Sequence, residues 1–148
     1  MNLSVLGGKN KAENVIENNP DINNWVIGGH SLGGVSACSF APKNNKIKGV
    51  VLYASYPQGD ELKNTDLRVL SLWGSEDIVA VLQKVIVAKE KVGSNSEFIE
   101  IEGGNHGHFG DYGEQKGDGE STISAEDQWN KTADYTIDFL NQINELNE

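Results

Sequence analysis

The chain has 148 residues, a formal net charge of −10 and a sequence pI of about 4.7. This length suits one domain, residues 1–148, that is large enough to bury a hydrophobic core. Its basic residues form no cluster, so neither nucleic acid nor an anionic membrane surface is an expected partner, and no apolar run is long enough to span a bilayer. The single cysteine, Cys38, cannot form an internal disulfide, and we expect it to be a buried apolar residue.

The first forty residues predict a helix, a strand and a second helix, in that order. We expect the first helix over residues 9–18, because Pro20 cannot continue a helix. The apolar run from Trp25 to Gly28 is typical of a strand, and the run from Leu32 to Phe40 is typical of a helix. The segment from Leu3 to Leu6 has two interpretations, a fragment of a strand or the lead into the first helix.

The rest of the chain predicts three more strands and two more helices. Because strands alternate with helices, we expect an α/β fold with a mostly parallel sheet, flanking helices and right-handed crossovers. The expected strands cover residues 47–54, 67–73 and 98–101, and the expected helices cover residues 79–92 and the segment that Ser124 opens.

The last expected helix carries apolar residues at spacings of three and four, which predicts one face buried against the sheet. We expect the three tryptophans of the chain to be core residues. The spacing runs through Trp129, Ala133, Ile137, Leu140 and Asn144, with Ile143 and Leu146 extending the apolar face, and the other two tryptophans are Trp25 and Trp73.

The junction between the first expected strand and the second helix carries the pattern G-x-S-x-G, formed by Gly29, Ser31 and Gly33. Between a strand and a helix this pattern is typical of a nucleophile elbow, a sharp turn that exposes a serine hydroxyl at the edge of a sheet. Glycine suits such a turn because the strand and the helix approach each other closely there. Ser31 is therefore a candidate nucleophile, with an ordinary turn serine as the alternative.

Two candidate partners of this serine follow at the ends of later strands. Asp77 comes just after the strand that ends at Trp73, and His106 follows the strand that ends at Ile101. The carboxyl ends of parallel strands meet at one edge of a sheet, where α/β folds place their sites. A serine hydroxyl needs an imidazole to take its proton, and the imidazole needs a carboxylate to orient it. We therefore predict a triad of Ser31, His106 and Asp77.

Neighbouring residues offer alternatives for both partners. Glu76 adjoins Asp77, and the spacing Gly-x-x-Asp favours Asp77. His108 lies two residues after His106 and is a second candidate base. His30 directly precedes the candidate nucleophile, and we expect it to point away from the serine and to be structural.

Three segments, Trp25 to Gly34, Trp73 to Asp77 and Gly103 to Gly113, together resemble the alpha/beta hydrolases, in particular the small bacterial group related to dienelactone hydrolases. In that group the histidine after Gly-Gly-Asn is catalytic, which supports His106. The group usually lacks a histidine at the position of His108, so this chain departs from the pattern there.

The resemblance implies a serine hydrolase that cleaves carboxylic esters through an acyl-enzyme, without a cofactor and with a small-molecule ester as substrate. The acidity of the chain favours neutral esters or amides as substrates. The polar stretch from Ser55 to Asp66 is too short to form the helical cap that many lipases insert there, which predicts an open site for a small acyl group.

The sequence also predicts only part of that fold, with the N-terminal strands missing. The elbow strand would then lie at an exposed edge, which invites pairing with another chain and a homo-oligomer. The N–H of Leu32 would supply one oxyanion donor, whereas the second normally comes from a loop after an earlier strand, and losing one donor lowers the rate by about 10²–10³-fold. Gly7-Gly8 could imitate that loop, but a plain turn is the simpler interpretation.

Two other functions remain open from the sequence. The chain could be a non-catalytic remnant of a hydrolase that acts as an association module through its exposed strand. His106, His108 and Asp111 could alternatively bind a metal, but two histidines on a glycine-rich loop offer no third ordered ligand, so we expect no metal site.

Overall fold

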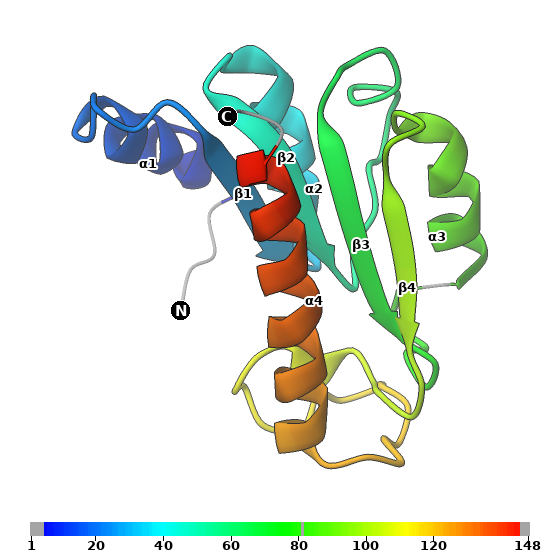
Figure 1. Cartoon of the computed structure of the whole chain (residues 1–148). Coiled ribbons are helices and arrows are strands. Elements are labelled where there is room, and N and C mark those ends of the chain that lie inside the picture. The colour runs from blue at the N-terminus through cyan, green and yellow to red at the C-terminus, as the bar shows by residue number, and fades with distance from the viewer. Residues whose placement is uncertain (1–4, 81, 146–148) are drawn as a thin grey trace.

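Four parallel strands form one sheet in the order β1-β2-β3-β4, with flanking helices, which confirms the expected fold class (Figure 1). The computed structural model describes residues 5–80 and 82–145. The strands are β1 (Trp25–His30), β2 (Ile47–Tyr53), β3 (Arg68–Gly74) and β4 (Glu97–Ile101). The helices are α1 (Val5–Glu17), α2 (Leu32–Phe40), α3 (Leu82–Ala88) and α4 (Ala125–Glu145), with short 3₁₀ turns at Ala41–Lys43, Lys89–Lys91 and Gly107–Phe109.

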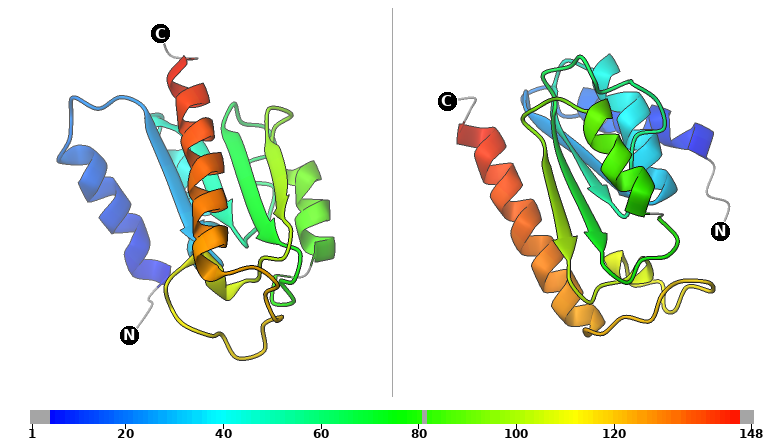
Figure 2. Two further views of the ribbon diagram at one scale, coloured as in Figure 1. Left: turned by 60° about the horizontal axis from the view of Figure 1, so that its bottom comes forward. Right: turned by 90° about the vertical axis from the view of Figure 1, so that its right-hand side faces the viewer.

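The sheet is covered on both faces, with α1, α2 and α3 on one side and α4 on the other (Figure 2). Alternate residues of the central strands serve the two sides, so both faces are apolar. Val50 and Val69 pack toward the side of α2, whereas Val51 and Leu70 pack toward α4. Cys38 is fully buried in the first of these layers, as expected, and burial raises the pKa of its thiol to about 12.

The first helix differs from its expected bounds. It begins at Val5 and runs through Gly7 and Gly8, so the plain turn expected there is wrong. A glycine inside a helix costs about 1 kcal/mol relative to alanine, and the packing of Ile16 and Ala12 against the core outweighs this local preference. Val5 and Leu6 are helical, which excludes a strand at those two positions, while Leu3 and Ser4 lie outside the described residues.

The helix after β3 is shorter than expected. Asp77 accepts hydrogen bonds from the N–H groups of Val79 and Ala80, both at 2.8 Å, and holds these residues in a turn before the helix. Helix α3 therefore covers Leu82–Ala88 only, followed by a 3₁₀ turn.

The buried face of helix α4 agrees only in part with the face that the spacing predicted. Gln128, Phe139 and Ile143 are its buried residues, whereas Trp129 is 39% exposed and Ile137 is 54% exposed. The expectation that Trp129, Ile137 and Leu140 belong to the core is therefore wrong, whereas the burial of Ile143 is confirmed. Trp73 is buried and Trp25 packs against the core, as expected. At the N-terminal end of the helix, the amide of Gln128 rather than the neighbouring indole is buried, and it bonds to the backbone of Asn105 in the turn after β4.

Strand β1 lies at one edge of the sheet. Within residues 5–80 and 82–145, β2 is the strand that pairs with it, and no strand lies on its other side. The side chains from Trp25 to Ile27 are only partly buried, unlike those at the centre of β2.

No helix in the part of the chain that the structure describes is both long and apolar enough to cross a membrane.

The N-terminus of α4 offers a test of the fold. Ser124 Oγ accepts the N–H of Asp127 at 3.0 Å, which caps the helix. We expect Ser124→Ala to lower the free energy of unfolding by about 1 kcal/mol because this N–H loses its acceptor. Ser124→Thr keeps a hydroxyl and serves as the control in chemical denaturation. Equal stability of the two variants would show that the cap contributes nothing.

Candidate active site

Ser31 occupies a sharp turn between β1 and α2. Its φ is 52°, a left-handed conformation that is strained for a residue with a side chain. Its N–H donates to the carbonyl of Tyr53 at 2.9 Å, and its carbonyl accepts the hydroxyl of Ser55 at 2.7 Å. The backbone of this serine is therefore fixed to β2 and to the segment that follows it.

Close backbone contacts explain two glycines of the turn. A Cβ on Gly29 would lie 2.3 Å from the carbonyl carbon of Gly33, and a Cβ on Gly34 would lie 2.5 Å from Oγ of Ser55. A Cβ on Gly33 would meet nothing within 4 Å, so space does not require glycine there. Close approach thus requires glycine at Gly29 of the motif and at the adjoining Gly34, but not at Gly33.

Asp77 and His106 form a buried pair. Nδ1 of His106 donates to Oδ2 of Asp77 at 2.8 Å, because an ionised carboxylate can only accept. The side chain of His106 is 2% exposed and that of Asp77 is 1% exposed. The second carboxylate oxygen of Asp77 accepts the two N–H groups of the turn before α3, so both oxygens are hydrogen-bonded. With Nδ1 bonded, Nε2 of His106 is the nitrogen left to act on another group.

The alternative partners take other positions. Glu76 accepts a hydrogen bond from the neighbouring Ser75 hydroxyl at 3.0 Å. The backbone N–H of His108 donates to Oδ1 of Asn105 at 3.1 Å, and its Nδ1 is buried without a hydrogen-bond partner among the residues that the structure describes. The structure therefore brings together Asp77 and His106, rather than either neighbour.

His30 lies against the ring of His106. Their ring centroids are 4.6 Å apart, and the ring of Tyr112 stacks on His30 at 5.5 Å with an interplanar angle of 17°. Burial, together with the nearby His106, lowers the pKa of His30 below its usual range, and within the described part of the chain its buried Nε2 has no hydrogen-bond partner. His30 is thus a neutral residue that packs against the ring of His106.

A pocket of about 190 Å³ opens over Ser31 and His106. Leu32, Val35 and Val79 contribute apolar surface to it, and among the described residues no lysine, arginine, aspartate or glutamate lines it. Ser31 and Ala54 are the non-glycine residues with positive φ in the described part of the chain, and both line this pocket. Backbone strain of this kind gathers at functional sites.

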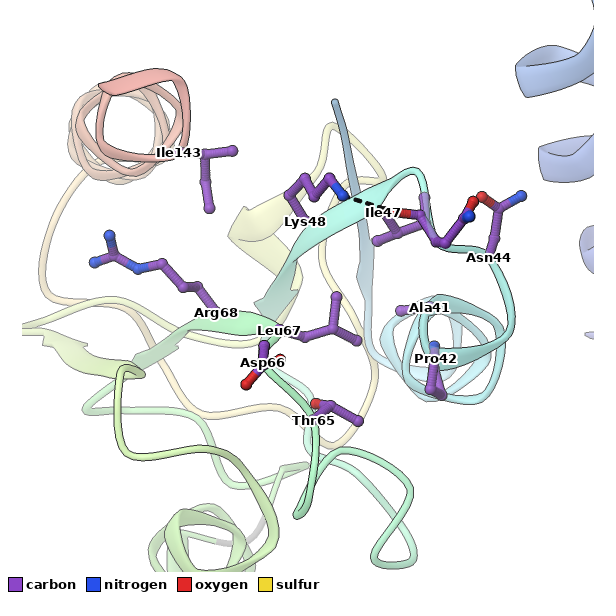
Figure 3. A pocket seen from close by; sticks show the side chains of 11 residues that line it. Ala41, Pro42, Asn44, Ile47, Lys48, Thr65, Asp66, Leu67, Arg68 and Ile143 are labelled. Atoms are coloured by element: carbon purple, nitrogen blue, oxygen red, sulfur yellow. Dashed lines mark hydrogen bonds between the residues drawn. The ribbon is translucent and has the colours of Figure 1, made fainter. Parts of the chain in front are cut away.

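A larger pocket of about 410 Å³ lies at the opposite ends of the strands (Figure 3). It adjoins Lys48 at the start of β2 and Arg68 at the start of β3. The guanidinium of Arg68 is already bonded to Glu97 and Gln142. Parallel sheets hold ligands at the carboxyl ends of their strands, so the smaller pocket is the candidate site.

Sequence reasoning missed a buried amide beneath the histidine turn. Gln128 is fully buried, and its Oε1 accepts the N–H of Asn105 at 3.0 Å while its Nε2 donates to the carbonyl of Asn105 at 2.9 Å. These bonds fix the residue that precedes His106. No signal in the sequence marked Gln128, because it lies 23 residues away and interrupts the apolar spacing of its helix.

Within the described ranges, no group of three or more His, Cys, Asp and Glu side chains is arranged to hold a metal ion. His106 already uses its Nδ1 for the carboxylate of Asp77.

Comparison with known proteins places the chain in a family. A sequence profile described as "Alpha/beta hydrolase family" matches residues 1–130. The search of curated proteins gave no significant match.

Solved structures share the fold at low sequence identity. A carboxylesterase from Nitrososphaera gargenis is 12% identical, with a TM-score of 0.68, over 96% of this chain and 73% of its own. A candidate CIB-like hydrolase from Thermoplasma acidophilum is 18% identical with a TM-score of 0.65, and a candidate dienelactone hydrolase from Klebsiella pneumoniae is 16% identical with a TM-score of 0.65. These two matches cover 90% and 88% of this chain, which spans 60% of each of those chains. On its sequence profile and its fold, the chain belongs to the alpha/beta hydrolase family.

Proposed function

We propose that this chain is a serine hydrolase that cleaves carboxylic esters through Ser31, His106 and Asp77. One observation carries the proposal. The buried hydrogen bond between Asp77 and His106 leaves Nε2 of the imidazole available, and His106 lines the same pocket as the strained Ser31. Membership of the alpha/beta hydrolase family and the fold shared with a carboxylesterase support the same class of reaction.

The first half of the cycle forms an acyl-enzyme. His106 Nε2 takes the hydroxyl proton of Ser31 while Oγ bonds to the ester carbonyl carbon. The tetrahedral intermediate then collapses, the bond to the alkoxy oxygen breaks, and His106 returns its proton to the departing alcohol. Asp77 stabilises the imidazolium that exists between these two transfers.

The second half of the cycle releases the acid. Water gives one proton to His106 and attacks the acyl carbon, and the bond to Ser31 Oγ breaks as that oxygen regains the proton. The cycle draws only on these side chains and water, so it involves no cofactor.

The developing oxyanion needs backbone donors. The N–H of Leu32 is the first amide of α2, and the first amides of a helix have no acceptor inside it. We assign this group as one donor, placed next to the nucleophile as in other elbows of this type.

The pocket favours small and uncharged substrates. A volume of about 190 Å³ equals on the order of six water volumes, which suits a short acyl chain. An anionic acyl group would lose its hydration there without gaining a cation from the described lining residues.

The nucleophile can be tested by covalent labelling. We expect a fluorophosphonate to add once to the parent chain, because Ser31 Oγ displaces fluoride from phosphorus, and we expect Ser31→Ala to remain unlabelled. His106→Gln and Asp77→Asn should label more slowly, with Asp77→Asn reduced by about 10⁴-fold. Intact-mass spectrometry measures each adduct, and loss of p-nitrophenyl acetate hydrolysis should follow the same order.

The controls separate folding from chemistry. Ser121→Ala removes another hydroxyl outside the pocket and should label like the parent. The buried Cys38 thiol is protonated at neutral pH and does not compete for the probe. A folded parent that acquires no adduct would refute the proposed function.

Substrate preference gives an independent prediction. Among p-nitrophenyl esters, we expect kcat/KM to be highest for acetate and butyrate and at least about tenfold lower for the dodecanoate, which exceeds the pocket. The valerate should exceed the anionic hemisuccinate of similar length by about tenfold, because a buried charge needs a partner. A preference for long-chain or anionic esters would contradict this assignment.

A second candidate function is association through the edge of the sheet. The outer edge of β1 has no partner strand among the described residues, and α4 exposes Trp129 and Ile137. Such surfaces favour pairing with another chain, here a second copy of this one.

Light scattering coupled to size exclusion separates the two candidates. An association module predicts a mass of twice 16.1 kDa that persists on dilution, because paired backbone groups and buried apolar surface stabilise the dimer. Ile137→Lys should weaken the dimer, and Asn130→Lys, an exposed change on the same helix, should not. A monomer at all concentrations that still labels at Ser31 would leave the hydrolase alone.

A further inference from the structure

We propose that Asp118 is a positioning residue for His106, and that the segment Asp118-Gly119 locks together the two turns that carry the buried pair. The catalytic consequence of this proposal rests on the proposed hydrolase function, whereas its structural consequence does not. Asp118 lies twelve residues beyond His106, in the irregular segment that leads to α4.

The carboxylate of Asp118 is bonded to the backbone of the histidine turn. Its Oδ2 accepts the N–H of Gly107 at 2.7 Å, and its Oδ1 accepts the N–H of His106 at 3.3 Å. Oδ1 also accepts the N–H of Gly119 at 2.8 Å, which fixes the carboxylate relative to its own backbone. Two oxygens thus serve three donors, an arrangement that charged acceptors favour.

Gly119 extends the lock to both turns. Its carbonyl accepts Nδ2 of Asn105 at 3.0 Å, one residue before His106. A Cβ on Gly119 would lie only 1.8 Å from the carbonyl oxygen of Glu76, so the backbone at Gly119 presses on the residue that precedes Asp77. The same two loop residues therefore touch the turn of the base and the turn of the carboxylate.

The position of the two turns matters because the hydrogen bond between His106 and Asp77 is lost when either side chain is displaced. His106 Nδ1 and Asp77 Oδ2 are 2.8 Å apart, and each side chain is carried by a turn beyond the end of its strand. Displacing one catalytic group by about 1 Å can lower a rate by about 100-fold. Asp118 does not line the pocket, so its effect on substrate binding should be small.

Asp111 provides a matched comparison. It carries the same side chain on the same acidic segment but is exposed to solvent, whereas Asp118 is partly buried. A general effect of loop charge would appear in both positions, and a positioning effect only at Asp118.

The experiment compares Asp118→Ala and Asp118→Asn with Asp111→Ala in the full chain. We expect Asp118→Ala to lower kcat for p-nitrophenyl acetate by about 10–100-fold with KM changed by less than about twofold. Asp118→Asn keeps the shape but offers one acceptor oxygen, so it should fall between this variant and the parent. Asp111→Ala should behave like the parent, and circular dichroism reports whether each variant is folded.

A readout independent of activity is the tautomer of His106, measured through long-range ¹H–¹⁵N correlation of its ring. In the parent and in Ser31→Ala we expect the proton on Nδ1, as the bond to Asp77 requires, and in Asp118→Ala a mixture of tautomers. A parent without ester hydrolysis or labelling would remove the proposed function but leave this spectral test standing. A parent-like tautomer in folded Asp118→Ala, or equal kcat for Asp118→Ala and Asp111→Ala, would overturn the positioning role.

Discussion

The local structure around the site depends on the buried hydrogen bond between His106 Nδ1 and Asp77 Oδ2. Both side chains are almost fully buried, and a buried carboxylate is costly unless its lone pairs are satisfied. The N–H groups of Val79 and Ala80 donate to the second oxygen of Asp77, and these two residues therefore form a turn instead of the first turn of α3. The shortened α3 is therefore a consequence of how Asp77 is held, and local structure here follows from the chemistry of one side chain.

Close backbone approach brings the two turns of this pair together. A Cβ on Gly74, at the end of β3, would lie 2.2 Å from the carbonyl oxygen of Gly104, and the N–H of Glu76 donates to that carbonyl at 2.8 Å. The parallel register already places the ends of β3 and β4 side by side. Glycines then allow the turns to touch, so that two short side chains can meet. Gln128 and Asp118 act at the next level, since each bonds to backbone within or beside the histidine turn.

The parts of this arrangement that the sequence could predict depend on short-range pattern. Apolar runs located all four strands, and the pattern around Ser31 located the turn between β1 and α2. The parts it could not predict depend on contacts between distant residues. Gln128 looks like a polar interruption of an apolar helix until its amide is seen against Asn105, and this contact displaces Trp129 to the surface. The turn predicted at Gly7-Gly8 is wrong because the packing of the whole helix outweighs the local preference of glycine for a turn.

The position of β1 separates two requirements of the proposed chemistry. Activation of Ser31 would depend on the inner edge of β1, which pairs with β2. On that side the N–H of Ser31 donates to the carbonyl of Tyr53, and β3 and β4, which precede Asp77 and His106, lie beyond β2 in the sheet. Stabilisation of the oxyanion would depend on two backbone donors, and the N–H of Leu32 in α2 is the one that we propose. In folds of this type the other comes from a loop on the far side of the elbow strand, which corresponds to the outer edge of β1. One missing donor lowers a rate by about 10²–10³-fold, whereas a missing nucleophile lowers it by about 10⁶-fold. A group that approaches the outer edge of β1 would therefore change the speed of the reaction far more than the identity of the residues that perform it.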